Sequence, residues 1–256
     1  MLTPTQHDRI DVILVGPRNP LNIGAVARAM ANFGFSHLSV VAAHDPHWRE
    51  ARSAVGAPEL LARAGEHETL PQAIAQNTLV LGTGTLTYRK PDQPVLQLPQ
   101  LGPLIQQELD RNGRIAILFG SEKRGLSRDE LSYCHALVEI PTDPHQPSMN
   151  LGQAAAVCLY ELACGTNHET TLVQKVVPQQ LGLEAADSAN LDRLANLIEE
   201  TMLAARYSPK SMHETNRHDL RVVLRRLNLS PLDTRRIFGL FRRILNRLNS
   251  SRGKSS

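Results

Sequence analysis

Two glycines separated by four residues, Gly120 and Gly125, follow an apolar run in the stretch FGSEKRGLS at residues 119–127. A phosphate-binding P-loop has this glycine spacing, but it needs a lysine directly after the second glycine to reach the β- and γ-phosphates. Leu126 occupies that position. The stretch therefore predicts a ligand loop lined by main chain, and it argues against nucleotide hydrolysis.

Two further loops carry residues that could bind a ligand. The stretch GPRNPLNIGAVAR at 16–28 places Asn22 and Arg28 at the head of an expected helix, and IPTDPHQPSMNLG at 140–152 carries Ser148 and Asn150. An arginine suits contact with a phosphate because its guanidinium donates two parallel hydrogen bonds. The three loops together suit a nucleotide-like ligand that is held by backbone groups, with an arginine on a phosphate.

Other kinds of site are disfavoured. His44 and His47 lie close together, but nothing near them completes a set of metal ligands, so no metal site is predicted. Ser148 lacks the G-x-S-x-G elbow of a serine hydrolase. A dinucleotide site needs three glycines after the first strand, whereas GTGTLT at 82–87 has two and follows the third. The three cysteines show no C-x-x-C spacing that would indicate a disulfide framework or zinc.

The elements that must position these loops are short and apolar. Five runs ended by a glycine, a proline or a polar turn predict strands at 10–16, 37–43, 78–84, 114–120 and 136–141. Helical spacing predicts helices at 22–34 and 101–113, which end at Gly34 and Gly113, and at 57–66, 71–76 and 151–163. Such alternation is typical of an α/β domain with a mainly parallel sheet, whose ligands bind beyond the carboxyl ends of the strands.

The C-terminal part is basic. Residues 206–256 carry 13 of the 28 Lys and Arg residues but 3 of the 25 Asp and Glu residues. A stretch without clear periodicity at 166–186 predicts a linker, and helices are expected at 188–208, with Ser188 as a cap, at 217–229 and at 231–249. A polyanion is therefore expected to dock here, and the predicted contacts are Arg221, Arg225, Arg235 and Arg242.

Taken in order, the three loops resemble the motifs of the SpoU branch of the SPOUT superfamily, which are RNA ribose 2′-O-methyltransferases. The matching patterns are N-x-G-x-x-x-R from Asn22 to Arg28, F-G-x-E-x-x-G-L from Phe119 to Leu126, and I-P-x6-S-x-N-L from Ile140 to Leu151. The stretches around them, over residues 9–163, are similar to the TrmJ-like group, which methylates cytidine or uridine at the first position of the tRNA anticodon loop.

The resemblance implies a fold and an assembly. It implies an α/β, parallel-sheet SPOUT fold with a deep C-terminal trefoil knot at residues 1–165, a linker at 166–186, and a small all-α, basic tRNA-binding extension at 187–256. A homodimer is also implied, with the cofactor site close to the subunit interface. The helix expected at 151–163 is apolar nearly all round, so it is expected to be buried either within the domain or against a second subunit.

The resemblance also implies roles for single residues. S-adenosylmethionine is the expected methyl donor, and its expected contacts are Thr83, Gly84, Thr85, Gly120, Ile140, Pro147, Ser148 and Met149. The expected catalytic group is Arg28 with Asn22, Glu122, Ser148 and Asn150, and no metal is needed. Arg28, Arg89 and Lys90 are expected to meet RNA, although the family often has an arginine pair earlier in that loop.

The sequence also bears on compartment and on alternatives. No run of about 20 apolar residues could cross a membrane and the first residues lack a secretion pattern, so a cytoplasmic protein without a membrane partner is expected. Within the same chemistry, ribosomal RNA is an alternative substrate to the tRNA anticodon stem-loop. A non-catalytic RNA-binding protein that retains the fold is an alternative from another class.

Overall fold

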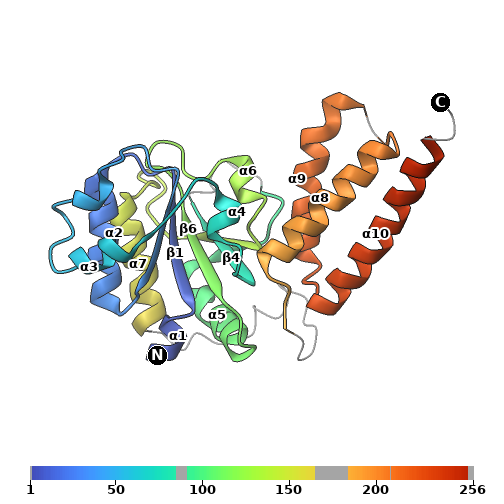
Figure 1. Cartoon of the computed structure of the whole chain (residues 1–256). Helices are drawn as coiled ribbons and strands as arrows, with labels where there is room; N and C mark the ends of the chain where they lie inside the picture. Colours follow the sequence, from blue (N-terminus) through green and yellow to red (C-terminus); the bar gives the residue numbers. More distant parts are fainter. Residues whose placement is uncertain (1, 85–90, 165–183, 208, 253–256) are drawn as a thin grey trace.

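The computed structural model describes residues 2–84, 91–164, 184–207 and 209–252 (Figure 1). A seven-stranded sheet with the order β3-β2-β1-β6-β4-β7-β5 lies at the centre of the first part of the chain, and every pairing is parallel. Its strands are β1 (Ile10–Val15), β2 (His37–Val41), β3 (Gly65–His67), β4 (Leu79–Thr83), β5 (Val95–Gln97), β6 (Ile115–Phe119) and β7 (Ala136–Glu139).

The sheet is covered on both faces because its strands are apolar on both faces. In β1, Ile10, Val12 and Leu14 enter one buried cluster, whereas Ile13 and Val15 enter the other. The first cluster lies under α2 (Pro20–Phe33), α3 (Pro58–Arg63), α5 (Leu101–Asp110) and α7 (Leu151–Cys164); the second lies under α4 (Leu70–Ala73) and α6 (Arg128–Leu131). Shorter helical segments are α1 (Pro4–His7), η1 (Trp48–Glu50) and η2 (Leu98–Gln100).

The five predicted strands are confirmed to within two residues at either end. The sequence analysis missed β3 and β5, which have three residues each and lie at the two edges of the sheet, where so short a segment carries no readable pattern. The helix predicted at 57–66 is wrong at its end, since α3 stops at Arg63 and β3 follows.

One of the two predicted helix stops is confirmed. Gly34 ends α2 in the left-handed conformation, with φ at 79°. Gly113 does not end α5, because the helix stops at Asp110 and Asn112 has the positive φ, 63°. A side chain at Gly113 would instead meet a Glu108 carboxylate oxygen at 2.2 Å, so close packing explains this glycine.

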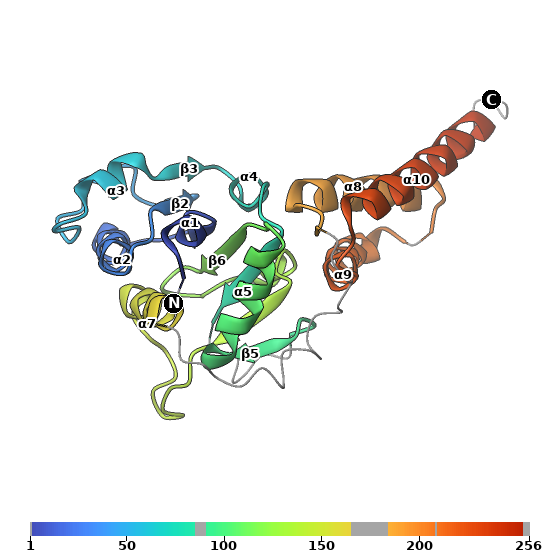
Figure 2. The same ribbon diagram turned by 90° about the horizontal axis from the view of Figure 1, so that it is seen from below.

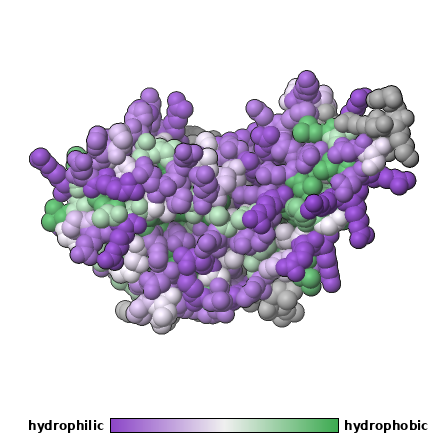
Figure 3. All heavy atoms as spheres, in the orientation of Figure 1, coloured by the Kyte–Doolittle hydropathy of each residue, from purple (hydrophilic) through white to green (hydrophobic). Residues whose placement is uncertain are grey.

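Three helices form most of the C-terminal part: α8 (Ser188–Ala204), α9 (His213–Arg226) and α10 (Pro231–Arg252), with the short segment η4 (Lys210–Met212). They share a third buried cluster. Figure 3 shows hydrophobic residues reaching the surface along these helices, where Leu232 and Leu240 of α10 are more than half exposed. Within the described ranges, no helix is long and apolar enough to span a membrane.

The C-terminal helices lie on the α4 side of the sheet (Figure 2). The predicted cap of α8 is wrong, because Asp187 accepts the hydrogen bond from the Asn190 amide at 2.7 Å. The hydroxyl of Ser188 instead donates to the Asn77 carbonyl at 2.8 Å. Ser188 therefore ties the start of α8 to the loop before β4.

Candidate functional site

A pocket of about 350 Å3 lies at the carboxyl edge of the sheet. The end of β4, the loop after β6, the loop after β7 and the first turn of α7 form its walls. Of the predicted cofactor contacts, those that line it are Thr83, Gly84, Gly120, Ile140, Pro147, Ser148 and Met149. Thr85, the remaining one, lies outside the described residues. The structure thus brings the second and third predicted loops together at one cavity.

The glycine pair of the second loop closes a tight turn. A side chain at Gly120 would meet the carbonyl carbon of Gly125 at 2.1 Å and the amide nitrogen of Leu126 at 2.2 Å, so only glycine fits. Gly125 has φ at 65°, and its amide donates to the Ser121 carbonyl at 2.8 Å. The two glycines therefore let the chain fold back on itself and present its backbone to the pocket.

Thr83 reaches the pocket mainly as backbone. Its side chain is buried, and its hydroxyl donates to the Leu118 carbonyl at 2.8 Å across the sheet. Gly84 follows without a side chain, and a methyl group added there would meet no atom within 4 Å. The pocket wall at Thr83 and Gly84 is therefore accessible main chain, and the Thr83 hydrogen bond holds it at the end of β4.

Glu122 joins the first loop to the second. Its carboxylate accepts hydrogen bonds from the Arg18 amide at 2.9 Å, the Asn19 amide at 3.0 Å and the Asn22 side-chain amide at 2.8 Å. Partial burial acts to raise the pKa of the Glu122 carboxyl, but the hydrogen bonds from Asn22 and the backbone amides outweigh it, and the pKa is lowered. Glu122 is therefore an anion that holds the first loop in place.

Asn150 joins the third loop to the first. Its side-chain amide donates to Asn22 Oδ1 at 2.9 Å, and its own Oδ1 accepts from the Gly152 amide at 2.9 Å at the start of α7. A side chain at Gly152 would meet the Ala25 methyl at 2.7 Å, which lets α7 approach α2 closely. Glu122, Asn22 and Asn150 thus form one chain of hydrogen bonds through all three loops.

Arg28 lies apart from this group. It is exposed on α2, nine residues beyond the cap at Asn19, or roughly 13 Å along the helix at 1.5 Å per residue. Arg28 does not line the pocket of its own chain. The expectation that this guanidinium adjoins the other site residues is therefore not met within one chain, because the helix carries it away from the sheet edge.

Two of the predicted RNA contacts are wrong. The Arg225 side chain is 1% exposed, and it donates to the Tyr133 carbonyl at 2.7 Å and to Asp192 at 3.0 Å. Arg221 is 13% exposed, pairs with Asp129 at 2.7 Å and lies over the Tyr133 ring. Both arginines fix α9 against α6 and Tyr133, and Arg225 also binds α8, so their guanidinium groups are already engaged within the chain.

The other predicted RNA contacts are either exposed or outside the described residues. Arg235 and Arg242 are exposed on α10, where a polyanion can reach them, and they stay predictions. Arg89 and Lys90 lie outside the described residues. No group of three potential metal ligands occurs in the part of the chain that the structure describes.

The sequence analysis also missed basic residues beside the pocket. Arg18, Lys123 and Arg124 line a second hollow that adjoins the first. They stand inside the stretches already singled out at 16–28 and 119–127. The sequence shows that both loops carry basic residues. It does not show that the two loops are neighbours, which follows from the strand order in the sheet.

The chain is similar to known proteins in both sequence and fold. The model of the SpoU rRNA Methylase family matches residues 9–160. A tRNA (cytidine/uridine/adenosine-2′-O-)-methyltransferase TrmJ from Pseudomonas aeruginosa is 39% identical over 156 residues, which are 60% of this chain and 60% of that protein. A tRNA (cytidine-2′-O-)-methyltransferase TrmJ from Methanocaldococcus jannaschii is 39% identical over 60% of this chain and 66% of its own length. The matched part thus spans less than two thirds of either relative.

A solved structure matches more of the chain. The crystal structure of TrmJ from Z. mobilis ZM4 has a TM-score of 0.78 and 27% sequence identity to it, and it covers 91% of this chain and 98% of that one. The family model ends at residue 160. The structural likeness therefore continues past the α/β part into the C-terminal helices.

Proposed function

The chain belongs to the SpoU rRNA Methylase family, and from this premise we propose that it is an S-adenosylmethionine-dependent RNA 2′-O-methyltransferase that acts on tRNA. The resemblance predicted from the three motifs is thereby confirmed at the level of the family. The observation that carries the proposal is the hydrogen-bonded chain from Glu122 through Asn22 to Asn150, which joins the three motif loops beside one pocket.

The pocket fits the proposed cofactor. Its volume of about 350 Å3 is that of a small-molecule site. Backbone groups dominate its walls at Gly84 and Gly120, where an added side chain would either project into open space or collide with the facing main chain. Met149 and Ile140 add apolar surface, and Ser148 adds a hydroxyl. These residues would hold the cofactor, which supplies an activated methyl group.

The residues of this chain have to align a ribose and assist loss of its proton. A 2′-oxygen must approach in line with the bond that the methyl group leaves, so positioning is the main contribution of the protein. Glu122 stays ionised and is engaged by three donors, which makes it a positioning residue for Asn22. Arg28 orients an RNA phosphate and the reacting ribose, and the pair of guanidinium and phosphate assists loss of the hydroxyl proton.

Arg28 serves the pocket of a second copy of the chain. No described side chain forms an ion pair or hydrogen bond with Arg28, and it is exposed on α2. Val157 and Tyr160 of the neighbouring α7 are also exposed, at 37% and 55%, although the helix is largely apolar. An apolar surface around an unused guanidinium fits the homodimer expected from the sequence, in which α2 and α7 are covered.

The finer features of the fold belong to the same proposal. The segment from β7 to α7 is threaded as a deep trefoil knot, which is consistent with β7 lying between β4 and β5 and with α7 packing on α2. Residues 1–165 form the methyltransferase domain, 166–186 the linker and 187–256 the tRNA-binding extension. The cytoplasm, where tRNA is found, is the proposed compartment.

The tRNA anticodon stem-loop is the proposed target. The TrmJ relatives carry tRNA 2′-O-methyltransferase names, and the chain presents Arg235 and Arg242 on the outer surface of α10. A basic helix surface suits a nucleic-acid backbone. Ribosomal RNA and a non-catalytic role in RNA binding remain the outcomes against which the proposal is tested.

Two measurements test the proposal. Calorimetry with S-adenosylmethionine is expected to show binding, and incubation with cofactor and tRNA is expected to give a 2′-O-methylated nucleotide that mass spectrometry maps to the anticodon loop. A folded chain that gives no binding heat is not the proposed enzyme. Methylation of ribosomal RNA alone would leave the chemistry in place and overturn the tRNA target.

A further inference from the structure

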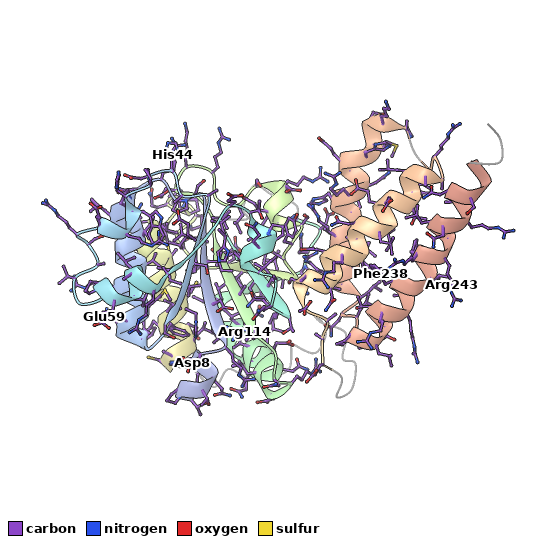
Figure 4. All side chains as sticks on the ribbon, in the orientation of Figure 1. Asp8, His44, Glu59, Arg114, Phe238 and Arg243 are labelled. Carbon is purple, nitrogen blue, oxygen red and sulfur yellow. The ribbon has the colours of Figure 1, made fainter. Side chains whose placement is uncertain are left out.

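A second hollow adjoins the pocket at the same edge of the sheet. Its volume is about 350 Å3, and it lies beyond the carboxyl ends of β1, β2 and β6, which are neighbours in the sheet. Figure 4 places His44, which follows β2, at this edge and shows Asp8 and Arg114 at the opposite one. Loops from three adjacent strands thus form one concave surface.

The lining of this hollow is cationic. Arg18, Lys123 and Arg124 contribute basic side chains to it, and His44 contributes an imidazole. The lining residues include one carboxylate, Glu130, and this group accepts the Ser127 amide hydrogen bond at 2.6 Å in the cap of α6. Arg18 and Lys123 alone outnumber the single carboxylate among the lining residues, so this concave surface has an excess of positive charge.

Two of the cations have no partner among the described residues. The hydrogen bond recorded for Arg18 runs from its backbone amide to Glu122, and the side chains of Arg18 and Lys123 form no ion pair with any described residue. Both residues are exposed. Repulsion between such cations is relieved by an anionic ligand, so the hollow is suited to one.

The hollow and the pocket are separated by a single turn. Ser121, Lys123, Arg124 and Gly125 line both of them, and the Ser121–Gly125 backbone bridge closes the turn. Glu122, in the same turn, binds the Arg18 amide on one side and the Asn22 side chain on the other. The position of Arg18 is thus fixed relative to the groups that surround the reacting atoms.

We propose that this hollow binds the phosphodiester backbone of the RNA substrate next to the methylated nucleotide, with Arg18 and Lys123 as phosphate contacts. The inference rests on the proposed function, because it takes RNA as the substrate. The cations come from separate loops and are exposed, which suits a chain of phosphates better than one enclosed anion. The first two motif loops then hold substrate on one side and cofactor on the other.

The test compares charge-removing variants with a matched control. The variants are Arg18→Gln, Lys123→Gln and the double substitution. The control is Arg63→Gln on α3, an 83% exposed arginine that lines a different hollow and lies 4.0 Å from Glu59. Binding of a tRNA transcript is measured by fluorescence anisotropy between about 50 and 200 mM salt, the range over which phosphate contacts are lost.

The expected result is a weaker and less salt-sensitive complex. Each removed contact lowers RNA affinity by about tenfold and reduces the slope of log affinity against log salt by about 0.7. Arg63→Gln changes neither quantity. Arg18 does not line the pocket, so Arg18→Gln keeps the wild-type affinity for S-adenosylmethionine and raises the KM for RNA more than it lowers kcat.

Two different failures can be told apart. If the double variant matches Arg63→Gln in RNA affinity and in salt slope, the hollow does not bind the RNA backbone and this inference is overturned. If the wild-type chain does not bind S-adenosylmethionine or methylate RNA, the proposed function fails, whatever the variants do. Unfolding curves of the variants establish that exposed substitutions have left the fold intact.

Discussion

Asn150 donates a hydrogen bond to Asn22 at 2.9 Å, although 128 positions separate the two residues in the sequence. Asn22 lies in the first turn of α2 and Asn150 precedes α7, so this contact ties the first motif to the third. Asn150 also accepts the Gly152 amide and thereby caps α7. The Asn150 side chain thus connects the loop before α7, the start of α7 and Asn22.

Replacing Asn150 with alanine is expected to weaken cofactor binding. The variant loses the bond to Asn22 and the cap of α7, which costs about 1–2 kcal/mol of folding stability. The loop that carries Ser148 and Met149 is then less well positioned, and calorimetry should record a higher Kd for S-adenosylmethionine. Asn249→Ala, an exposed change near the end of α10, is the control and should alter neither quantity.

Replacing Glu122 with glutamine is expected to give a pH-dependent loss of stability. The pKa of Glu122 is lowered in the folded chain, so its contribution is fully present above the unfolded-state pKa and is lost as the pH falls through the folded-state value. Denaturant unfolding should show the wild type more stable at pH 7 and the difference shrinking below about pH 4. A difference that stays constant over this range contradicts the role given to the ionised carboxylate.

Two glycine substitutions in the pocket should differ in their effect on folding. Gly120→Ala forces a methyl group onto the backbone of Gly125 and Leu126, within 2.2 Å, and should destabilise the fold by more than about 3 kcal/mol. Gly84→Ala meets no atom within 4 Å and should keep wild-type stability. Because its methyl group projects into the pocket wall, Gly84→Ala should nevertheless bind S-adenosylmethionine more weakly, as calorimetry can measure.

Alanine substitutions of Arg225 and Arg235 should affect different properties, the first folding stability and the second RNA binding. Arg225→Ala removes a buried guanidinium and leaves Asp192 and the Tyr133 carbonyl unpaired, at a cost of about 3–5 kcal/mol in chemical unfolding. Arg235→Ala changes an exposed residue and should shift stability by less than about 0.5 kcal/mol, while it weakens tRNA binding in anisotropy. The reverse pattern would restore the direct RNA contact that the sequence predicted for Arg225.

The sequence was most informative where a pattern is local. Continuous apolar runs located β1, β2, β4, β6 and β7, because strands buried on both faces need such runs. Most of the pocket residues lie in the second and third motifs, as Gly120 and Ser148 do, and those motifs were visible as residue patterns. The edge strands β3 and β5 were missed because three residues are too few to show a period.

Docking between distant segments could not be predicted in the same way. Arg221, Arg225, Arg235 and Arg242 all lie on basic amphipathic helices, and periodicity alone cannot tell which of them faces another part of the chain. Arg221 and Arg225 face another part of the chain, because both lie over the Tyr133 ring and Arg225 also donates to the Tyr133 carbonyl.

The buried contact between Arg225 and Tyr133 has a consequence for substrate choice. It pins α9, and through the shared apolar cluster also α10, at a set separation from the carboxyl edge of the sheet. Under the proposed function, an RNA that contacts both the pocket and α10 has to place its reactive ribose and its bound stem at that same separation. The proposed enzyme would then select its substrate by overall shape, without contacts to base edges.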